Sequence, residues 1–254
     1  MQPEIESDRT VTKVWGGWQT IGFGLAVFAV YLVVQSVIAI IFFMGRYLSE
    51  PVTDLTQLLA NLSTDGLLVS ITVIVSAVAG IAMILLFIKI RKGATIKEYL
   101  GLNPISKKTM LINLAIVIGL IAVSSFLGPV FDASKDTAFM IDAYKTSIWP
   151  ALLGVAVVIF APLFEEVFFR GFLFLGLERS RLGSFGTIVL TAVAWALLHL
   201  QYDVFGMATI LILGLVFGIV RLRTGSLWST LLLHSIWNLV AIVGTALYIN
   251  GVGS

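Results

Sequence analysis

The sequence predicts an all-α membrane protein, a polytopic transmembrane helical bundle of about seven spans (seven to eight) with short interfacial helices. Two observations support this fold class. Hydrophobic residues make up 59% of the 254 residues and charged residues only 12%, which is more apolar surface than a soluble core of this size can bury. The apolar residues also form long runs, and the basic residues gather in alternate loops between these runs. Because the chain has no Cys, disulfides, thiol catalysis and thiolate metal sites are excluded.

About 20 apolar residues cross a hydrocarbon core of roughly 30 Å as a helix. Seven segments approach this length, at residues 20–44, 67–88, 110–131, 149–177, 184–200, 205–221 and 227–248. The fifth and sixth are short, at roughly 16–17 residues each. We therefore expect the loop between them, 201–204, to dip below the membrane surface, where protein or trapped water must surround it.

The predicted organisation is a single domain with a cytoplasmic tail at 1–18, N-terminal transmembrane helices at 19–132 and a catalytic helical core at 133–254. The first apolar run is too long for a signal-peptide core and lacks a small-residue cleavage site, so it is predicted to be a retained span. Two loops carry helical patterns typical of interfacial helices or of packed loops, formed by Leu55, Leu58, Leu59 and Leu62 and by Phe139, Met140 and Tyr144.

The basic residues predict the orientation of the bundle. Twelve of the sixteen Lys and Arg residues fall in the tail and in the loops after the second, fourth and sixth spans. Only Arg46, Lys135 and Lys145 fall on the opposite side, and Arg170 lies within a span. The positive-inside rule then places the N-terminus in the cytoplasm and the C-terminus outside. The short loops and the lack of an organelle-targeting segment favour a prokaryotic plasma membrane.

Two histidines and two carboxylates lie inside the apolar runs. His199 and His234 are the only two histidines of the chain, and Glu165 and Glu166 are the only carboxylates in these runs. An ionisable group at bilayer depth costs about 2.5–3.5 kcal/mol on insertion scales, so it is a functional-site hypothesis by default.

Helical spacing divides the roles of the two carboxylates. Glu166 and Arg170 are four residues apart, which predicts a structural intrahelical ion pair. Glu165 then points toward the interior of the bundle. Pro162 removes a backbone donor and tends to kink the helix, which helps to open a cavity beside Glu165.

The same spacing groups the remaining polar residues. Trp195 and His199 share one helix face, and His234 and Asn238 share another. If these groups meet Glu165, the carboxylate and an imidazole can activate a water, and an imidazole with an amide can stabilise an oxyanion. Alternatively, Glu165, His199 and His234 form the ligand set of many catalytic zinc sites, although the H-E-x-x-H pattern is absent. Asn238 could instead tie two helices together, and Trp195 could serve packing alone.

Three motifs together resemble a known family. They are Glu165-Glu166-x-x-x-Arg170, Trp195-x-x-x-His199 and His234-x-x-x-Asn238, and the similarity extends through 161–164 and 221–227. This set resembles the CAAX-processing and bacteriocin-processing intramembrane proteases, often called the CPBP or Abi family. The resemblance covers roughly residues 149–240, and the first three spans match only as apolar helices. The aromatic residue before the first histidine is commonly Phe in this family, whereas Trp195 stands here.

The resemblance implies an intramembrane endopeptidase whose active site is reached from the cytoplasm. By analogy, Glu165 and His199 activate the water, while His234 and Asn238 stabilise the oxyanion. The family has been described both as glutamate proteases and as metalloproteases, so a divalent metal such as zinc remains an option. A metal-free site is favoured, since Asn238 is a better oxyanion donor than metal ligand. The implied partners are the lipid bilayer and a peptide or membrane-anchored protein substrate, with no nucleic acid.

Two other functions are compatible with the pattern. One is a non-catalytic immunity or scaffold protein that binds a peptide toxin or partner. The other is a proton-coupled transporter that uses Glu165 and the histidines as a relay, although the sequence shows no inverted repeat. No residue pattern identifies a prenyl pocket, the physiological substrate or an oligomeric state.

Overall fold

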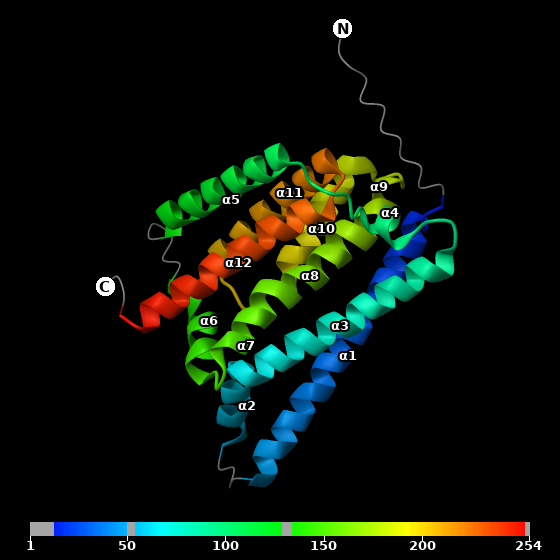
Figure 1. Cartoon of the computed structure of the whole chain (residues 1–254). Helices are drawn as coiled ribbons and strands as arrows, with labels where there is room; N and C mark the ends of the chain where they lie inside the picture. Colours follow the sequence, from blue (N-terminus) through cyan, green and yellow to red (C-terminus); the bar gives the residue numbers. More distant parts are fainter. Residues whose placement is uncertain (1–12, 50–53, 129–133, 252–254) are drawn as a thin grey trace.

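The computed structural model describes residues 13–49, 54–128 and 134–251, and all regular secondary structure in these ranges is helical. Six helical segments are long and apolar enough to cross a membrane (Figure 1). They are α1 (Gly17–Ser49), α3 (Gly66–Arg91), α5 (Lys107–Leu127), the continuous segment Pro150–Glu178, α11 (Val204–Thr224) and α12 (Leu227–Ile249). With the shorter apolar helix α10 (Gly183–Leu197), they confirm the predicted helical membrane bundle.

The fourth span changes helix type along its length. It runs through α7 (Pro150–Val155), the π-helix η2 (Ala156–Phe160), α8 (Ala161–Glu165), the π-helix η3 (Glu166–Leu173) and α9 (Phe174–Glu178). This span packs against α3 on one side and α12 on the other, and it also touches α1, α4 (Ile96–Leu100), α10 and α11. It is therefore the central helix of the bundle, as Figure 1 shows for α7 and α8.

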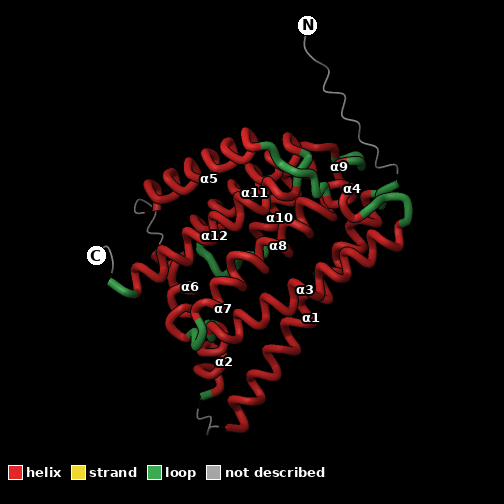
Figure 2. Tube along the Cα trace, viewed as in Figure 1, coloured by secondary structure: helices red, strands yellow, loops and turns green. Residues whose placement is uncertain are grey.

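The fifth and sixth spans differ from the predicted bounds. Helix α10 ends at Leu197, because the N–H groups of Leu198 and His199 bond carbonyls only three residues back. Its 15 residues cover about 22 Å, less than a hydrocarbon core. Helix α11 is longer than predicted, since Asp203 caps its first turn and it continues to Thr224. The connecting loop 198–203 is the green segment drawn midway along the bundle in Figure 2.

Both predicted loop helices are present, as α2 (Leu55–Ser63) and α6 (Ser134–Thr146). Asp54 caps the first turn of α2 with its side chain. Residues 1–12 of the predicted tail and 129–131 of the third predicted span lie outside the described residues.

Glycines let the helices approach the central span closely. A Cβ at Gly80 of α3 would collide with the ring of Phe164, and a Cβ at Gly24 of α1 would lie 2.7 Å from Leu173 Cδ2. On α11, a Cβ at Gly214 would stand 2.9 Å from Cβ of Ala192. The pair Gly214 and Gly218 thus serves packing of α11 on α10 within this chain.

The α4 segment holds the turn between α11 and α12. The N–H of Leu227 donates to the Gly101 carbonyl at 2.8 Å, and Ser226 Oγ donates to the Asn103 carbonyl at 2.5 Å. Asn103 Nδ2 returns a bond to the Gly225 carbonyl at 3.1 Å. Gly225 itself is left-handed, with φ of 61°, which ends α11. These bonds fix where α12, which carries His234, enters the bundle.

Candidate active site

The two π-helical segments of the fourth span flank Glu165. In η2, backbone bonds join residues five apart, so the Val157 carbonyl would pair with the nitrogen of Pro162, which carries no hydrogen. Asn238 Nδ2 of α12 donates to this carbonyl at 2.9 Å instead. Pro162 thus follows a π-helical turn in which one carbonyl is satisfied from a neighbouring helix.

Glu166 and Arg170 form the predicted ion pair. Arg170 Nη1 lies 3.1 Å from Glu166 Oε1, and both side chains are fully buried. Arg170 Nη2 donates to the Gly214 carbonyl at 3.3 Å, which ties the pair to α11. Two opposite charges at this burial are tolerated because each has a charged or hydrogen-bonding partner.

Aromatic rings enclose the Arg170 guanidinium. Its carbon lies 4.5 Å from the centre of the Trp195 ring and 5.6 Å from that of Phe217. The contact with Trp195 is a cation–π interaction in a dry environment, where it can contribute about 2 kcal/mol. Arg170 therefore fixes the plane of the Trp195 indole, which is itself 2% exposed.

The Trp195 indole connects Glu165 to the rest of the site. Its Nε1 donates to Glu165 Oε2 in a short hydrogen bond. The Glu165 side chain is 20% exposed, in contrast to the sealed Glu166. Glu165 is therefore oriented by one donor and still open to water or substrate.

His234 lies between the two carboxylates. Its Nδ1 is 3.0 Å from Glu166 Oε1, and its Nε2 is 3.9 Å from Glu165 Oε2. Since Arg170 keeps Glu166 an acceptor, we assign a hydrogen to Nδ1 of His234. The ring stands edge-on to Trp195, with centroids 5.1 Å apart. Nε2 is thus turned toward Glu165 by a hydrogen bond on the opposite nitrogen.

His199 lies two residues beyond the end of α10 rather than in its last turn. Its Nδ1 is 2.8 Å from the Trp195 carbonyl oxygen. A carbonyl has no hydrogen to give, so Nδ1 must be the donor and Nε2 carries the lone pair of the neutral ring. The imidazole stands edge-on to Trp195 at 5.4 Å and stacks on Tyr202 at 6.1 Å. Sequence spacing placed His199 beside Trp195 correctly, although in a turn and not on a helix face.

The structure thus gathers the predicted residues around one side chain. Trp195 contacts Glu165, His199, His234 and Arg170. Asn238 is one helical turn beyond His234, and one of its two N–H groups is engaged by Val157.

Several residues at the site were not predicted from the sequence. The Gly214 carbonyl and Phe217 belong to α11, whose glycines signalled close packing but no polar contact. Tyr31 of α1 stacks on Phe164 at 4.3 Å and interacts electrostatically with Glu165. A Tyr and a Gln four residues apart, Tyr31 and Gln35, in an otherwise apolar span were the available signal.

The geometry does not fit the zinc alternative. Among residues 13–49, 54–128 and 134–251, no three His, Asp or Glu side chains come together as a metal-binding group. Glu165 and His234 approach each other, whereas Nδ1 of His199 is turned to a backbone carbonyl. A catalytic zinc site requires three protein ligands.

Comparison with known proteins gives one family. Residues 147–240 match the model described as Rce1-like, type II CAAX prenyl endopeptidase. The matched range contains all seven predicted site residues and leaves out α1, α3 and α5. No curated protein and no solved structure matches the chain. The resemblance that the motifs indicated is thereby confirmed.

Proposed function

We propose that this chain, whose residues 147–240 match the Rce1-like, type II CAAX prenyl endopeptidase model, is an intramembrane endopeptidase that uses a Glu/His-activated water and a His/Asn oxyanion site. The observation that carries the proposal is the geometry at Glu165. This carboxylate lies in an apolar span and is part-exposed, accepts the Trp195 N–H and faces His234 Nε2 at 3.9 Å.

In this proposal Glu165 and His199 activate the water. The ionised carboxylate is held by an indole donor and keeps capacity to accept a proton from a water molecule. His199 offers the lone pair of Nε2, because its Nδ1 hydrogen is committed to the Trp195 carbonyl. Both groups contact the Trp195 side chain, Glu165 through the indole N–H and His199 through an edge-on ring contact.

His234 supplies an oxyanion donor when it is doubly protonated. Nδ1–H donates to Glu166, so Nε2–H is directed toward Glu165 and the space beside it. In that state the cluster holds two carboxylates, one guanidinium and one imidazolium. The charges cancel, which is the condition under which ion pairs persist in a low-dielectric interior. A donor fixed before the reaction needs no reorganisation as charge develops on the substrate oxygen.

Asn238 is the second proposed oxyanion donor. Its amide has two N–H groups, and the bond to the Val157 carbonyl uses one of them. That bond orients the amide plane and leaves the second N–H for a substrate oxygen. Asn238 thus combines the two roles that the sequence left open, a helix tie and a donor.

The proposed orientation puts the N-terminus in the cytoplasm. It is supported by the basic residues at the ends of α3, α9 and α11, which form one end of the bundle around α4. The substrate is proposed to be a membrane-associated peptide or protein in a prokaryotic plasma membrane.

The test uses purified protein in liposomes with two fluorogenic peptides, a farnesylated CAAX peptide and its unprenylated form. We expect cleavage of at least one peptide by the wild type and its loss in Glu165→Ala, with mass spectrometry locating the cut. Lys145→Ala, at an exposed position on α6, serves as a control. Equal cleavage by Glu165→Ala, in protein with the same thermal unfolding midpoint, overturns the proposal and leaves binding without chemistry as the function.

A further inference from the structure

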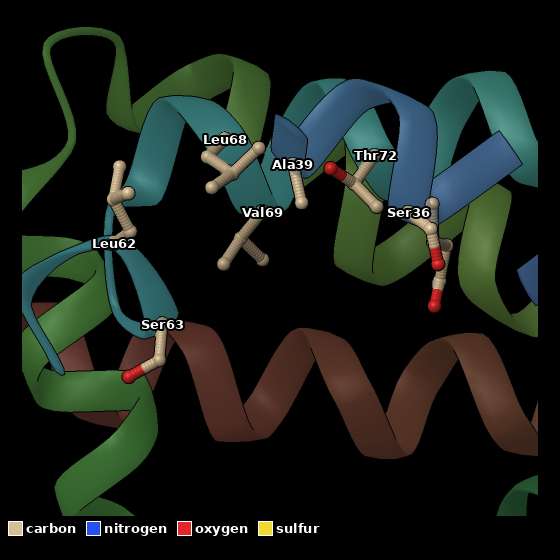
Figure 3. A pocket seen from close by; sticks show the side chains of 8 residues that line it. Ser36, Ala39, Leu62, Ser63, Leu68, Val69 and Thr72 are labelled. Atoms are coloured by element: carbon tan, nitrogen blue, oxygen red, sulfur yellow. The ribbon is translucent and has the colours of Figure 1, made fainter. Parts of the chain in front are cut away.

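The two ends of the bundle are joined in different ways. Near α2, an open groove of about 290 Å³ lies between α1, α2 and α3, and none of its eight lining residues is charged (Figure 3). Near α4, in contrast, the side chain of Arg221 is only 7% exposed and bonds to two other segments. Burying a charge is costly, so Arg221 is a candidate for a role beyond packing. The proposed mechanism does not use this guanidinium, although Arg221 begins the 221–227 motif of the sequence.

Arg221 bonds the second π-helical segment of the fourth span. In η3 the backbone bonds join residues five apart, and in the following helix α9 they join residues four apart. Where one pattern gives way to the other, the carbonyls outnumber the available N–H groups by one. The Arg170 carbonyl lies in the last turn of η3 and accepts from Arg221 Nε at 2.8 Å. Arg221 thus supplies, from α11, a donor to a turn that is one N–H short.

A second bond ties the same side chain to α4. Arg221 Nη2 donates to the Leu100 carbonyl at 3.4 Å, at the end of α4, where the carbonyls have no partner within the helix. The guanidinium carbon also lies 5.8 Å from the centre of the Phe174 ring. A Cβ at Gly101 would collide with the guanidinium, so the glycine makes room for it. Arg221 therefore joins α11, α4 and the fourth span at one point.

Two side-chain bonds of this kind lie on either side of the proposed catalytic carboxylate in the sequence. Before Glu165, Asn238 of α12 donates to the Val157 carbonyl in η2. After it, Arg221 of α11 donates to the Arg170 carbonyl in η3. If the second carbonyl lost its donor, the turn could return to α-helical pairing. The number of residues per turn would then change, which would rotate the Arg170 side chain relative to Glu165.

We propose that Arg221 is a positioning residue of the peptidase site and that it acts through Arg170. The inference rests on the proposed function. Holding the Arg170 carbonyl fixes the direction in which the Arg170 side chain leaves the helix. That side chain lies 3.1 Å from Glu166 Oε1 and 4.5 Å from the centre of the Trp195 ring. Because the Trp195 indole donates to Glu165, the bond made by Arg221 determines where the proposed base points.

The first test replaces the guanidinium and measures cleavage of the farnesylated fluorogenic peptide in liposomes. Arg221→Lys keeps the charge but has a single nitrogen, which cannot reproduce the planar fork that spans two carbonyls. We expect kcat per folded molecule to fall about tenfold with KM within about twofold, since misplacement by a distant residue can cost up to about 10²-fold. Arg223→Lys, at an exposed position of the same helix, is the matched control and should change neither. A merely structural role predicts less folded protein with an unchanged kcat per folded molecule.

The second test displaces the guanidinium without changing it. In Gly101→Ala the new Cβ takes the space that the Arg221 side chain occupies. Gly101 is left-handed, with φ of 68°, so the substitution also strains the backbone. Gly251→Ala is the matched control for this strain, because Gly251 has φ of 70° and open space around it. We expect kcat per folded molecule to fall in Gly101→Ala as it does in Arg221→Lys, and to stay unchanged in Gly251→Ala.

The third test asks whether Arg221 acts along the path through Arg170 and Trp195. It combines Arg221→Lys with Trp195→Phe and compares the loss of kcat with the losses in the two single variants. If both residues act along one path, the double variant should stay within about threefold of the larger single loss. Independent effects would multiply instead, to about 100-fold when each single loss is about tenfold.

The outcomes separate this inference from the proposed function. A wild-type kcat per folded molecule in both Arg221→Lys and Gly101→Ala overturns the inference, while cleavage that depends on Glu165 keeps the proposed function. A rise in KM with kcat unchanged also overturns it, because Arg221 would then contact the substrate. Losses that multiply in the double variant overturn the path through Arg170. No cleavage by the wild type overturns both.

Discussion

The two adjacent carboxylates of the fourth span have opposite surroundings. Glu166 is completely buried and is bonded by Arg170 at 3.1 Å and by His234 at 3.0 Å. Glu165, one residue earlier, is 20% exposed and is bonded by Trp195. The difference teaches that a helix step of about 100° is enough to separate a group that holds the bundle together from a group that can take up a substrate.

The largest expected effect is on the cleavage rate of variants of Glu165, the part-exposed carboxylate. Glu165→Gln keeps the shape of the side chain and its bond with Trp195 but removes the base, so we expect the cleavage rate to fall about 10²–10⁴-fold. The unfolding midpoint should stay close to that of wild type, because the side chain is part-exposed. Initial rates with the farnesylated peptide, corrected for folded protein, provide the measurement. A midpoint that drops with the rate would mean that Glu165 is structural.

Variants of the buried Glu166–Arg170 pair should lower the stability of the fold. Arg170→Met leaves Glu166 as a buried charge with one partner fewer, which costs about 3–5 kcal/mol. The double variant Arg170→Met, Glu166→Leu should recover much of this loss, because no unpaired charge remains. Thermal unfolding in detergent measures both, with the exposed Arg223→Met as control. An Arg170→Met variant as stable as wild type would contradict the structural role of the Glu166–Arg170 ion pair.

Variants of Asn238 test whether one residue can have both a structural and a catalytic role. Asn238→Ala should cost about 1–3 kcal/mol of stability, since the Val157 carbonyl loses its donor, and should also slow cleavage. Adding Pro162→Ala returns a backbone N–H to that carbonyl. We expect the double variant to recover stability while its cleavage rate stays low. Recovery of both would assign Asn238 to structure alone.

The Trp195 side chain contacts both Glu165 and Arg170, the partner of Glu166. Trp195→Phe keeps an aromatic ring and removes the hydrogen bond to Glu165. We expect kcat to fall about tenfold, as for the loss of a hydrogen bond to a charged group, with KM within twofold. Benzothienylalanine at this position, in which sulfur replaces the N–H, should behave like Phe. Full activity with this isostere would show that only the ring is needed.

The smallest expected effect comes from metal removal. Since the described residues bring together no three metal ligands, treatment with a chelator should change the rate less than twofold. Elemental analysis of the same sample supplies the control. Activity that disappears with the chelator and returns with zinc would contradict the metal-free proposal.

The sequence was sufficient for the bundle and for part of the site. Long apolar runs predicted every span, and the i, i+4 spacing predicted the contacts of Glu166 with Arg170 and of Trp195 with His199. Local spacing cannot reveal contacts between helices. The bond of Trp195 with Glu165 and that of His234 with Glu166 arise from packing of α10 and α12 on the fourth span.

Backbone detail was also beyond the pattern. The end of α10 at Leu197 follows from turn hydrogen bonds in a segment that is still apolar, so hydropathy continued the helix through 200. The π-helical turns arise where Pro162 removes a donor and where residues 166–173 pack against α1, α3, α4, α10, α11 and α12. Pro162 predicted a kink, but only the fold shows that Asn238 donates a hydrogen bond to the Val157 carbonyl.

The most direct test of the division between the two carboxylates is the initial cleavage rate per folded molecule, compared between Glu165→Gln and Glu166→Gln in the same liposomes. We predict that Glu165→Gln loses at least 100-fold with the wild-type amount of folded protein, about the lower limit for a lost general base. Glu166→Gln should mainly lose folded protein, and its remaining folded molecules should cleave faster than those of Glu165→Gln. The reverse order of rates per folded molecule would contradict the account.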